Sequence, residues 1–251
     1  MAEGGGGQAA PAVGGRHSGP LSKVGLGVGI SPLGIGLDLS TNLNQHFNVR
    51  ATGNFFNYSD SFTTDGITAD AKLSFASAGA SLDVYPFHNG FRLSPGVLFM
   101  NRNQVTATTN VPGGTSFTLN DQDYYSANAN AATGATPIVG SGSLGLNATK
   151  PAFTITAGWG NTIQRSGHWS FPVELGVALI GTPVVKMNLS GWACYDQAQT
   201  MCTNLADSAD PNSVEIQDNL NAQVAKWNSD IEPLKTYPIA SFGVNYSFRV
   251  R

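Results

Sequence analysis

The chain is short of charge. Asp, Glu, Lys and Arg make up 12% of its 251 residues, about half the share that is usual in soluble domains. The net charge of −3 leaves no basic footprint, so we expect no nucleic-acid partner. Apolar residues nowhere run for the length of a membrane-spanning helix, which excludes that class. What the chain does have is apolar residues (41%) mixed with Asn, Ser, Thr and Gly, a composition typical of transmembrane β-barrels.

Residues 1–22 are rich in Gly, Ala and Pro and contain no apolar stretch long enough for a secretory signal. We interpret them as a disordered tail. They are either the mature end left after a signal peptide was removed or a sequence added for expression. Residues 23–251 are predicted to form the barrel.

From Lys23 onward the hydrophobic period is two, which is the period of β-strands. Alternating rows of about ten residues or more are long enough to cross a bilayer at a tilt. They cover 33–41, 46–57, 91–102, 151–162, 168–191 and 237–250. In 67–86 the apolar row moves from odd to even positions near Ser77, which predicts a β-bulge with one extra residue. The row in 168–191 continues through Pro183, so we predict one long strand there despite a turn signal at 181–183.

The connections are of two kinds. Those at 42–45, 87–90 and 164–167 are short, whereas 59–66, 108–147 and 193–235 are long loops. Short turns on one rim and long loops on the other are typical of outer-membrane barrels, whose long loops lie outside. With a first strand ending before Ser31 and Pro32, the fold class is all-β, an antiparallel transmembrane β-barrel of about eight strands. A single long strand over 23–41 is the alternative.

The last long loop contains the one segment of helical period. Asp210 and Pro211 suit an N-cap and a first helical position. The apolar residues that then recur at helical spacing are Leu220, Val224, Trp227 and Ile231. We predict an amphipathic helix over 212–231, which either packs on the barrel rim or plugs its mouth, or binds a partner or the membrane surface. Its position relative to the lumen stays open.

Both cysteines of the chain, Cys194 and Cys202, fall in the same loop. Their separation suits a small loop disulfide, and an exported location permits one. Because no histidine lies nearby in the sequence, we expect no metal site at these cysteines.

Four runs of sequence resemble a known family. They are YPFHNGFRLSPGVLF (85–99), AGWGN (157–161), VELGVALIGTPVVKMNLSG (173–191) and YPIASFGVNYSF (237–248). They are similar to small Gram-negative outer-membrane β-barrel proteins of the OmpA/OmpW class, most of which are uncharacterised. The resemblance implies a location in the outer membrane, contact with outer-membrane lipid and assembly by the barrel-assembly machinery, and it carries over no catalytic residue. Family chains usually end at the terminal aromatic, whereas here three residues follow Phe248.

The inward row of the predicted barrel carries the charges. Four acids and six bases face the lumen in this prediction: Asp38, Arg50, Asp70, Lys72, Asp83, Arg92, Arg102, Glu174, Lys186 and Arg249. A bore of eight strands has room only for side chains, so buried charges of opposite sign must pair. One interpretation is a salt-bridged interior that closes the barrel. The other is a narrow, slightly anion-favouring conduit that opens when pairs such as Arg92–Glu174 rearrange.

The outward rows carry aromatic residues near the strand ends, as in the aromatic girdles at membrane interfaces. They are Phe47, Phe55, Phe91, Phe99, Trp159, Trp169, Phe171, Tyr237, Phe242, Tyr246 and Phe248. A soluble lipocalin-like barrel would turn these residues inward and leave too few charges on its surface. We therefore expect lipid outside.

No residue pattern predicts enzymatic chemistry. His46, His88 and His168 lie at or beside short turns without a Ser or Asp partner at a recognisable spacing, and the glycine-rich run 27–34 matches no nucleotide-binding motif. We expect no enzyme activity and no cofactor or metal. The expected function is a structural or surface protein, or a narrow passive channel for small polar solutes, in a monomeric barrel. A surface protein that binds through its loops, or a lipid-modifying outer-membrane enzyme, is the alternative.

Overall fold

The computed structural model describes residues 19–64, 67–87, 89–146 and 150–250, which form mostly antiparallel sheet. The described residues contain one helix, α1 (Pro211–Ile231). The strands are β1 (Lys23–Ser31), β2 (Gly34–Asn42), β3 (Phe47–Thr64), β4 (Ile67–Val84), β5 (Phe91–Asn101), β6 (Gln104–Val111), β7 (Ser116–Leu119), β8 (Gln122–Ser126), β9 (Ile138–Gly145), β10 (Ala152–Trp159), β11 (Trp169–Ser170), β12 (Val173–Leu179), β13 (Val184–Ser190), β14 (Trp192–Cys194), β15 (Cys202–Asn204) and β16 (Thr236–Arg249).

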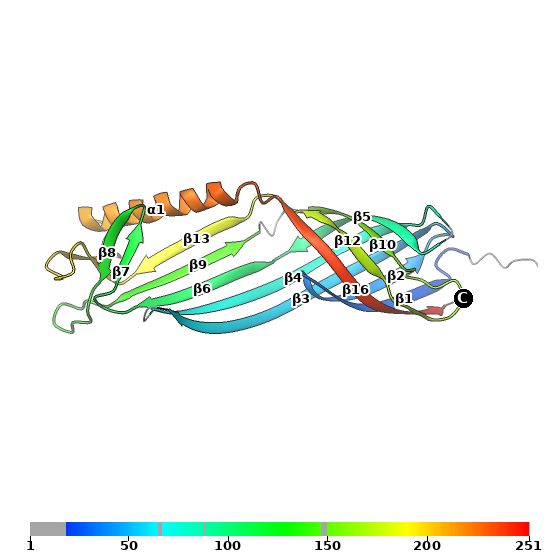
Figure 1. Ribbon diagram of the computed structural model, residues 1–251, viewed down its shortest axis with the longest axis horizontal. Helices are drawn as coiled ribbons and strands as arrows, with labels where there is room; N and C mark the ends of the chain where they lie inside the picture. Colours follow the sequence, from blue (N-terminus) through cyan, green and yellow to red (C-terminus); the bar gives the residue numbers. More distant parts are fainter. Residues whose placement is uncertain (1–18, 65–66, 88, 147–149, 251) are drawn as a thin grey trace, which may run out of the picture.

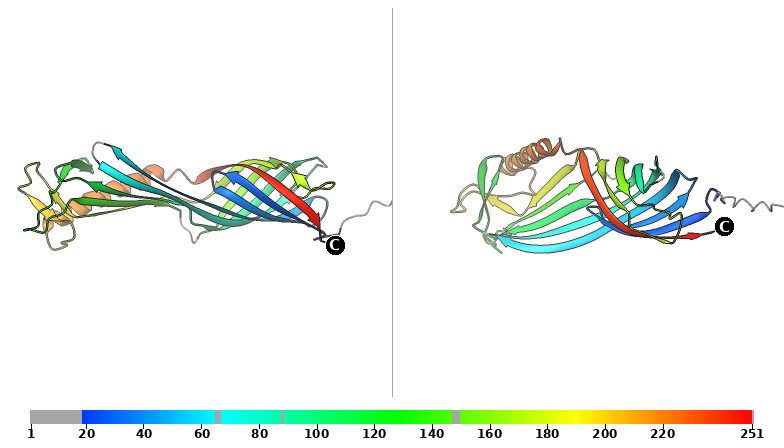
Figure 2. Two further views of the ribbon diagram at one scale, coloured as in Figure 1. Left: turned by 90° about the horizontal axis from the view of Figure 1, so that it is seen from below. Right: turned by 45° about the vertical axis from the view of Figure 1, so that its right-hand side comes forward.

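Within the described residues, eight strands close a barrel: β1, β2, β3, β4, β5, β10, β12 and β16. Figures 1 and 2 show this closed ring at one end of an elongated molecule. The predicted fold class is therefore confirmed. β1 and β2 form a tight hairpin instead of one long strand, because Gly34 adopts φ +110° and a Cβ there would lie 2.6 Å from the Phe55 carbonyl oxygen.

Five strands continue the wall beyond one side of the barrel as an open sheet, which we call the extension. It consists of the distal halves of β3 and β4 followed by β6, β9 and β13, and it occupies the left half of Figure 1. The prediction of a long loop over 108–147 is therefore wrong, because most of this segment is ordered sheet. A small sheet, β15-β14-β8-β7, and α1 cover the far end of the extension. The core between them includes Val111, Leu119, Tyr124, Ile138, Leu189, Ile216 and Leu220.

The apolar row changes face where the barrel passes into the extension. β3 and β4 pair without a shift from Phe47–Val84 to Thr64–Ile67, so the predicted bulge in 67–86 is not in β4. The shift lies in the pairing of β4 with β5, where Phe99 is the extra residue. In β4 the even apolar residues of the barrel half point outward, and the odd ones of the extension point toward its concave face. The row changes because the apolar surroundings lie outside the barrel but inside the extension.

The predicted strand 168–191 is also wrong, because it is divided into β11, β12 and β13. The break at 180–183 contains Gly181 with φ +73°. Beyond the break, β13 pairs with β9 of the extension. Leu175 of β12 is 64% exposed on the outside of the barrel, whereas Leu189 of β13 is buried in the core of the extension. The odd residues face the outside of the barrel before the break and the core of the extension after it. Both places are apolar, so the apolar row looks continuous in the sequence.

The predicted helix is confirmed, with Asp210 as its N-cap and Pro211 at its start. It packs in the core of the extension through Ile216 and Leu220 and does not enter the bore, as Figure 1 shows. Asn228 of the helix also covers the edge of β13: its side chain accepts a hydrogen bond from Val185 N (2.8 Å) and donates one to Val185 O (3.0 Å).

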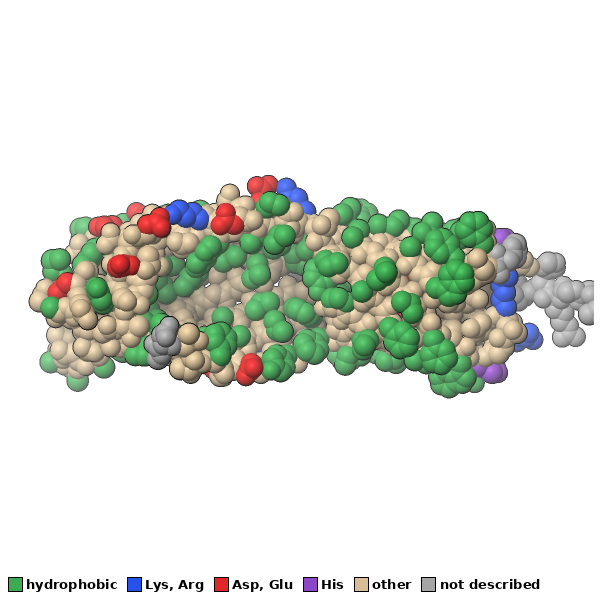
Figure 3. Space-filling model, viewed as in Figure 1, with side chains coloured by type: hydrophobic (Ala, Val, Ile, Leu, Met, Phe, Trp, Pro, Cys, Tyr) green, Lys and Arg blue, Asp and Glu red, His purple; other side chains and the backbone are tan. Residues whose placement is uncertain are grey.

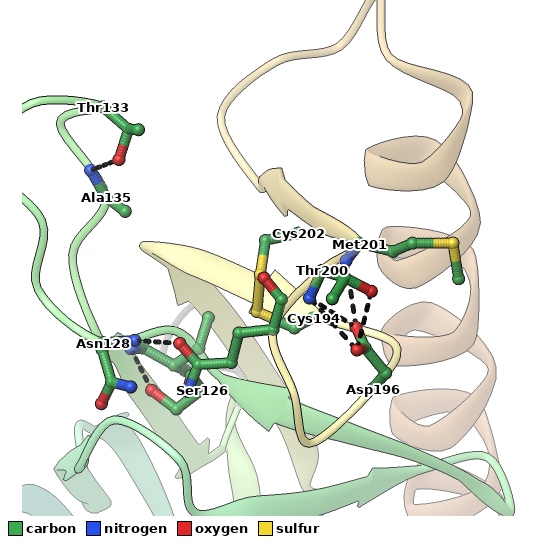
Figure 4. The surroundings of a disulfide bond; sticks show 11 residues. Ser126, Asn128, Thr133, Ala135, Cys194, Asp196, Thr200, Met201 and Cys202 are labelled. Carbon is green, nitrogen blue, oxygen red and sulfur yellow. Dashed lines mark hydrogen bonds between the residues drawn. A yellow bond between two sulfur atoms is a disulfide. The ribbon is translucent and has the colours of Figure 1, made fainter.

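The predicted disulfide between Cys194 and Cys202 is present and joins β14 to β15. Figure 4 shows the adjacent turn, in which the Asp196 carboxylate accepts hydrogen bonds from the amides of Thr200 and Met201. The disulfide therefore belongs to the small sheet that covers the extension.

Of the predicted N-terminal tail, 1–22, residues 1–18 lie outside the described residues and residues 19–22 are described. The part that is described contacts the barrel. Leu21 N donates a hydrogen bond to Asn42 O (2.7 Å), and Ser22 is buried. Residues 21 and 22 thus belong to the rim of the short turns.

Candidate functional site: an ion layer across the bore

The centre of the barrel holds four charged side chains from four strands. Arg50 of β3, Asp83 of β4, Arg92 of β5 and Glu174 of β12 all lie on inward rows, and each is buried. Arg92 and Asp83 are 0% exposed. Buried charges are stable only where opposite charges and hydrogen bonds compensate each other.

The four charges form one connected network, which we call the ion layer. Arg50 Nη2 lies 3.1 Å from Asp83 Oδ1 and 2.6 Å from Glu174 Oε1. Arg92 Nε donates to Glu174 Oε1 (3.1 Å), and its Nη2 contacts the same oxygen. Arg92 Nη1 donates to Gly160 O. Arg92 and Glu174, the pair given as an example in the sequence analysis, are thus in contact.

Neutral groups complete the ion layer, with Ser94 beside the Asp38 cavity and Thr162, Tyr85 and Asn48 on the side of the short turns. Ser94 Oγ donates to Asp83 Oδ1 (2.7 Å) and Thr162 Oγ1 to Asp83 Oδ2 (3.0 Å). Tyr85 Oη accepts from Thr162 N at 3.1 Å, and Asn48 Nδ2 donates to Thr162 Oγ1 at 3.2 Å. The connection between β10 and β11 thus inserts Thr162 into the bore below the ion layer.

Glycine on β1 makes room for this insertion. A Cβ on Gly25 would lie 2.8 Å from Thr162 O, and one on Gly27 would lie 2.1 Å from Asn245 Oδ1. The inner face of β1 therefore carries no side chain at the level where the connection crosses the bore.

Asp38 lies on the other side of the ion layer and accepts a hydrogen bond from Thr52 Oγ1 (2.5 Å). It lines a cavity of about 100 Å³ that also borders Arg50, Arg92 and Glu174. With Asp38, the lumen contains three of the predicted acids and two of the predicted bases. The excess of bases on which the predicted slight preference for anions rested is therefore not found in the central bore.

The other five predicted lumen charges lie elsewhere. Asp70 and Lys72 are exposed on the convex face of the extension, where Asp70 accepts a hydrogen bond from Ser61. Arg102 is exposed at the end of β5, and Lys186 is exposed on β13. Arg249 lies at the mouth beside the short turns. These five predictions fail because the sequence does not show where the bore ends.

Sequence reasoning missed the neutral members of the site. Tyr85, Ser94 and Asn48 continue the inward rows already traced, so the same alternation would have found them. Thr162 is the last inward position of the predicted row 151–162, but it lies in the connection after β10, and the alternation did not show that this connection enters the bore.

The outward aromatic residues form the exterior predicted for them. Phe55, Phe99, Trp159, Trp169, Phe171 and Phe242 are each about half exposed or more. Phe47 and Phe91 are partly exposed, as are Tyr246 and Phe248. Tyr237 is the exception: it is partly buried against Leu33, Leu98 and Ala152. Figure 3 shows hydrophobic side chains over the barrel half of the molecule.

The described residues contain no group of three or more His, Cys, Asp and Glu placed to hold a metal ion. The helix among them does not combine the length and the apolar character of a membrane span. His46 and His168 lie at the short-turn end, where His168 Nδ1 is 2.8 Å from Ser247 O. The third predicted turn histidine, His88, lies outside the described residues.

The protein is thus a closed, eight-stranded antiparallel β-barrel with an apolar exterior and a charged layer across its bore. Two crystal structures from Acinetobacter baumannii have a similar fold. CarO is 18% identical, with a TM-score of 0.54 over 91% of this chain and 98% of that one. CarO2 is 19% identical, with a TM-score of 0.54 over 90% and 98%. No protein-family model and no curated protein matches the sequence, so the likeness shown is one of fold, and the resemblance to an OmpA/OmpW-like family stays a prediction.

Proposed function

We propose that the protein is an outer-membrane β-barrel of a Gram-negative bacterium with a closed bore, acting as a structural or surface protein. Its barrel half exposes a belt of large apolar side chains, among them Leu26, Leu37, Ile155 and Leu175. A soluble monomer rarely exposes such a belt, which suits lipid. In this orientation the short turns face the periplasm and the extension lies outside the cell.

The burial of Arg92 carries the proposal of a closed bore. Its guanidinium is 0% exposed and contacts Glu174 on β12 and Gly160 O at the end of β10, while Arg50 reaches Glu174 from β3 on the other side of the ring. A barrel of this size has room for side chains and little else. The ion layer and Thr162 together fill the cross-section, so solutes have no continuous path.

Recording conductance across a planar bilayer tests this proposal. The refolded protein is first checked for a heat-dependent shift on an SDS gel. We expect no steady current from the native barrel, and leak currents from Arg92→Ala and Glu174→Gln. The control Lys186→Ala changes an exposed residue outside the barrel and should stay silent. Discrete openings of the native protein that change size in the two bore variants would contradict the closed bore.

That outcome would favour the second candidate, a narrow passive channel for small polar solutes. The cavity beside Asp38 supports it, because it already opens part of the bore on the side of the extension. Rearrangement of the ion layer would then be the step that connects this cavity with the periplasmic end.

The concave face of the extension supports binding at the surface as a further role. Tyr58 and Phe62 of β3 are 52% and 55% exposed, and Figure 3 shows the extension as a hollow lined in part by hydrophobic side chains. Exposed apolar surface of this kind marks interaction sites. Outer-membrane lipid and the barrel-assembly machinery remain the partners that we propose, and we propose no enzymatic activity.

A further inference from the structure

The mouth at the short-turn end brings three cations together. Lys23 on β1 and Arg249 on β16 are direct cross-strand partners, and both lie on inward rows. Arg165 comes from the connection between β10 and β11 and lines the same cavity. Like charges directly opposite each other destabilise a strand pair. We call these three residues the basic mouth, and Figure 3 shows basic side chains at this end of the molecule.

Two cations of the basic mouth donate hydrogen bonds to neutral carbonyl oxygens. Lys23 Nζ donates to the carbonyl oxygens of Gln164 (2.7 Å) and Arg165 (3.0 Å), and Arg165 Nη2 donates to Gln45 O (3.1 Å). Among the described residues, the guanidinium of Arg249 has no hydrogen-bonding or ion-pair partner. An ammonium has three donors and a guanidinium five, so most of the donors at the mouth remain for a ligand.

The cavity between these residues has a volume of about 290 Å³ and is lined by no acidic residue of the described chain. Side-chain amides of Asn44, Asn161 and Gln164 add hydrogen-bonding groups to its wall. Tyr85 and Asn48 form its floor, and Thr162 lies between this floor and Asp83. The cavity is therefore a blind cup, which suits a ligand that binds and does not pass through.

We propose that the basic mouth binds a phosphate-bearing anion. Its several oxygens carry more than one negative charge and accept from ammonium, guanidinium and amide donors together. Such an anion would relieve the repulsion between Lys23 and Arg249. A phospholipid headgroup and a free phosphate compound share this chemistry. The inference does not depend on whether the bore conducts, because Thr162 lies between this cavity and the ion layer.

The test uses the full-length protein refolded in non-ionic detergent at low salt, titrated with inorganic pyrophosphate in a calorimeter. We expect saturable binding at one site, weakened about tenfold or more in Arg249→Gln and in Lys23→Gln, because each removes a charge-assisted contact. Lys72→Gln is the matched control, since Lys72 is exposed on the extension. A second arm replaces pyrophosphate with phosphatidylglycerol in mixed micelles, and phosphatidylcholine serves as its blank.

Binding in either arm that is lost in the two mouth variants supports the proposal, and the arm that responds identifies the source of the phosphate. Thermal unfolding adds an independent signature: without the anion, Arg249→Gln should be more stable than the native protein, because the like-charged pair is gone. With pyrophosphate, the native protein should gain stability and the variant should not. Absence of binding in both arms, or binding that the mouth variants leave unchanged, would overturn the proposal.

Discussion

Arg92 of β5 and Glu174 of β12 meet above a glycine. Both are register partners of Gly158 on β10, which lies between their strands. A Cβ at Gly158 would lie 2.5 Å from Val173 O and 2.9 Å from Glu174 Cγ. The missing side chain leaves the space in which the two charges pair.

Gly158→Ala should therefore destabilise the barrel by about 1–3 kcal/mol, the usual effect of forcing extra atoms into a packed interior. Urea unfolding of the protein in lipid vesicles measures this difference. Gly53→Ala is the control, because a Cβ at Gly53 would meet nothing within 4 Å. Equal stability of the two variants would show that Gly158 is not needed for the pair.

Arg92→Met should cost more, about 3–5 kcal/mol, because it leaves Glu174 with less compensation in a buried site. The double variant Arg92→Met/Glu174→Gln should recover part of this loss, since it removes the buried carboxylate together with its partner. A double-mutant cycle on unfolding free energies gives the coupling. Additive effects of the two changes would argue against a direct interaction.

The change of the apolar row between β12 and β13 predicts that a charge on the outer face is harmful in β12 and tolerated in β13. Leu175 faces outward from the barrel, so Leu175→Arg should destabilise it by about 2–4 kcal/mol if it lies near the middle of the bilayer. Asn188 is exposed on the convex face of the extension, and Asn188→Arg should be neutral. The yield of heat-modifiable protein after refolding reports both effects. A tolerated arginine at 175 would contradict the lipid-facing assignment.

The same change of row limits how much of the fold the sequence could predict. Alternation identified the strands of the barrel and the rows that hold Arg50, Asp83, Arg92 and Glu174, because inside and outside differ in polarity. It could not show at Ser77 or at 180–183 that the apolar side itself turns over. The pattern of apolar residues alone does not distinguish a bulge, a break in the strand and a change of the apolar side. The insertion of Thr162 depends on tertiary packing alone.

Acid should loosen the covered end of the extension before the barrel. The hydrogen bond from the Thr203 hydroxyl and the amide of Asn212 lower the pKa of Asp210 below its ordinary value of 3.8, and the amides of Met201 and Thr200 lower the pKa of Asp196. Both carboxylates thus stabilise the fold above that ordinary value, and this contribution is lost as the pH falls through their lowered values.

Circular dichroism of the helix during acid titration measures this loss. Asp210→Asn keeps an N-cap side chain but should flatten the acid transition, whereas the barrel signal should stay constant through the same range. An unchanged transition in Asp210→Asn would assign the acid sensitivity to other groups.

Asn228 predicts how the edge of β13 is protected. Asn228→Ala removes both hydrogen bonds to Val185 and leaves an open strand edge, which invites pairing with another chain. We expect faster hydrogen exchange at Val185 and concentration-dependent association of the variant. Asn221→Ala, at an exposed position of the same helix, is the control. Exchange at Val185 that does not change would show that the helix covers the edge by packing alone.

The uninterrupted hairpin of β3 and β4 has a mechanical consequence. The two strands run in one register from the short turns to the tip of the extension, so a pull on the tip along their axis reaches the barrel wall directly. There it acts as shear on the hydrogen bonds to β2 and β5, many of which bear the load together instead of opening one after another. In the orientation that we propose, the extension is thus a stiff lever fixed in the wall, able to carry tension from outside the cell into the membrane.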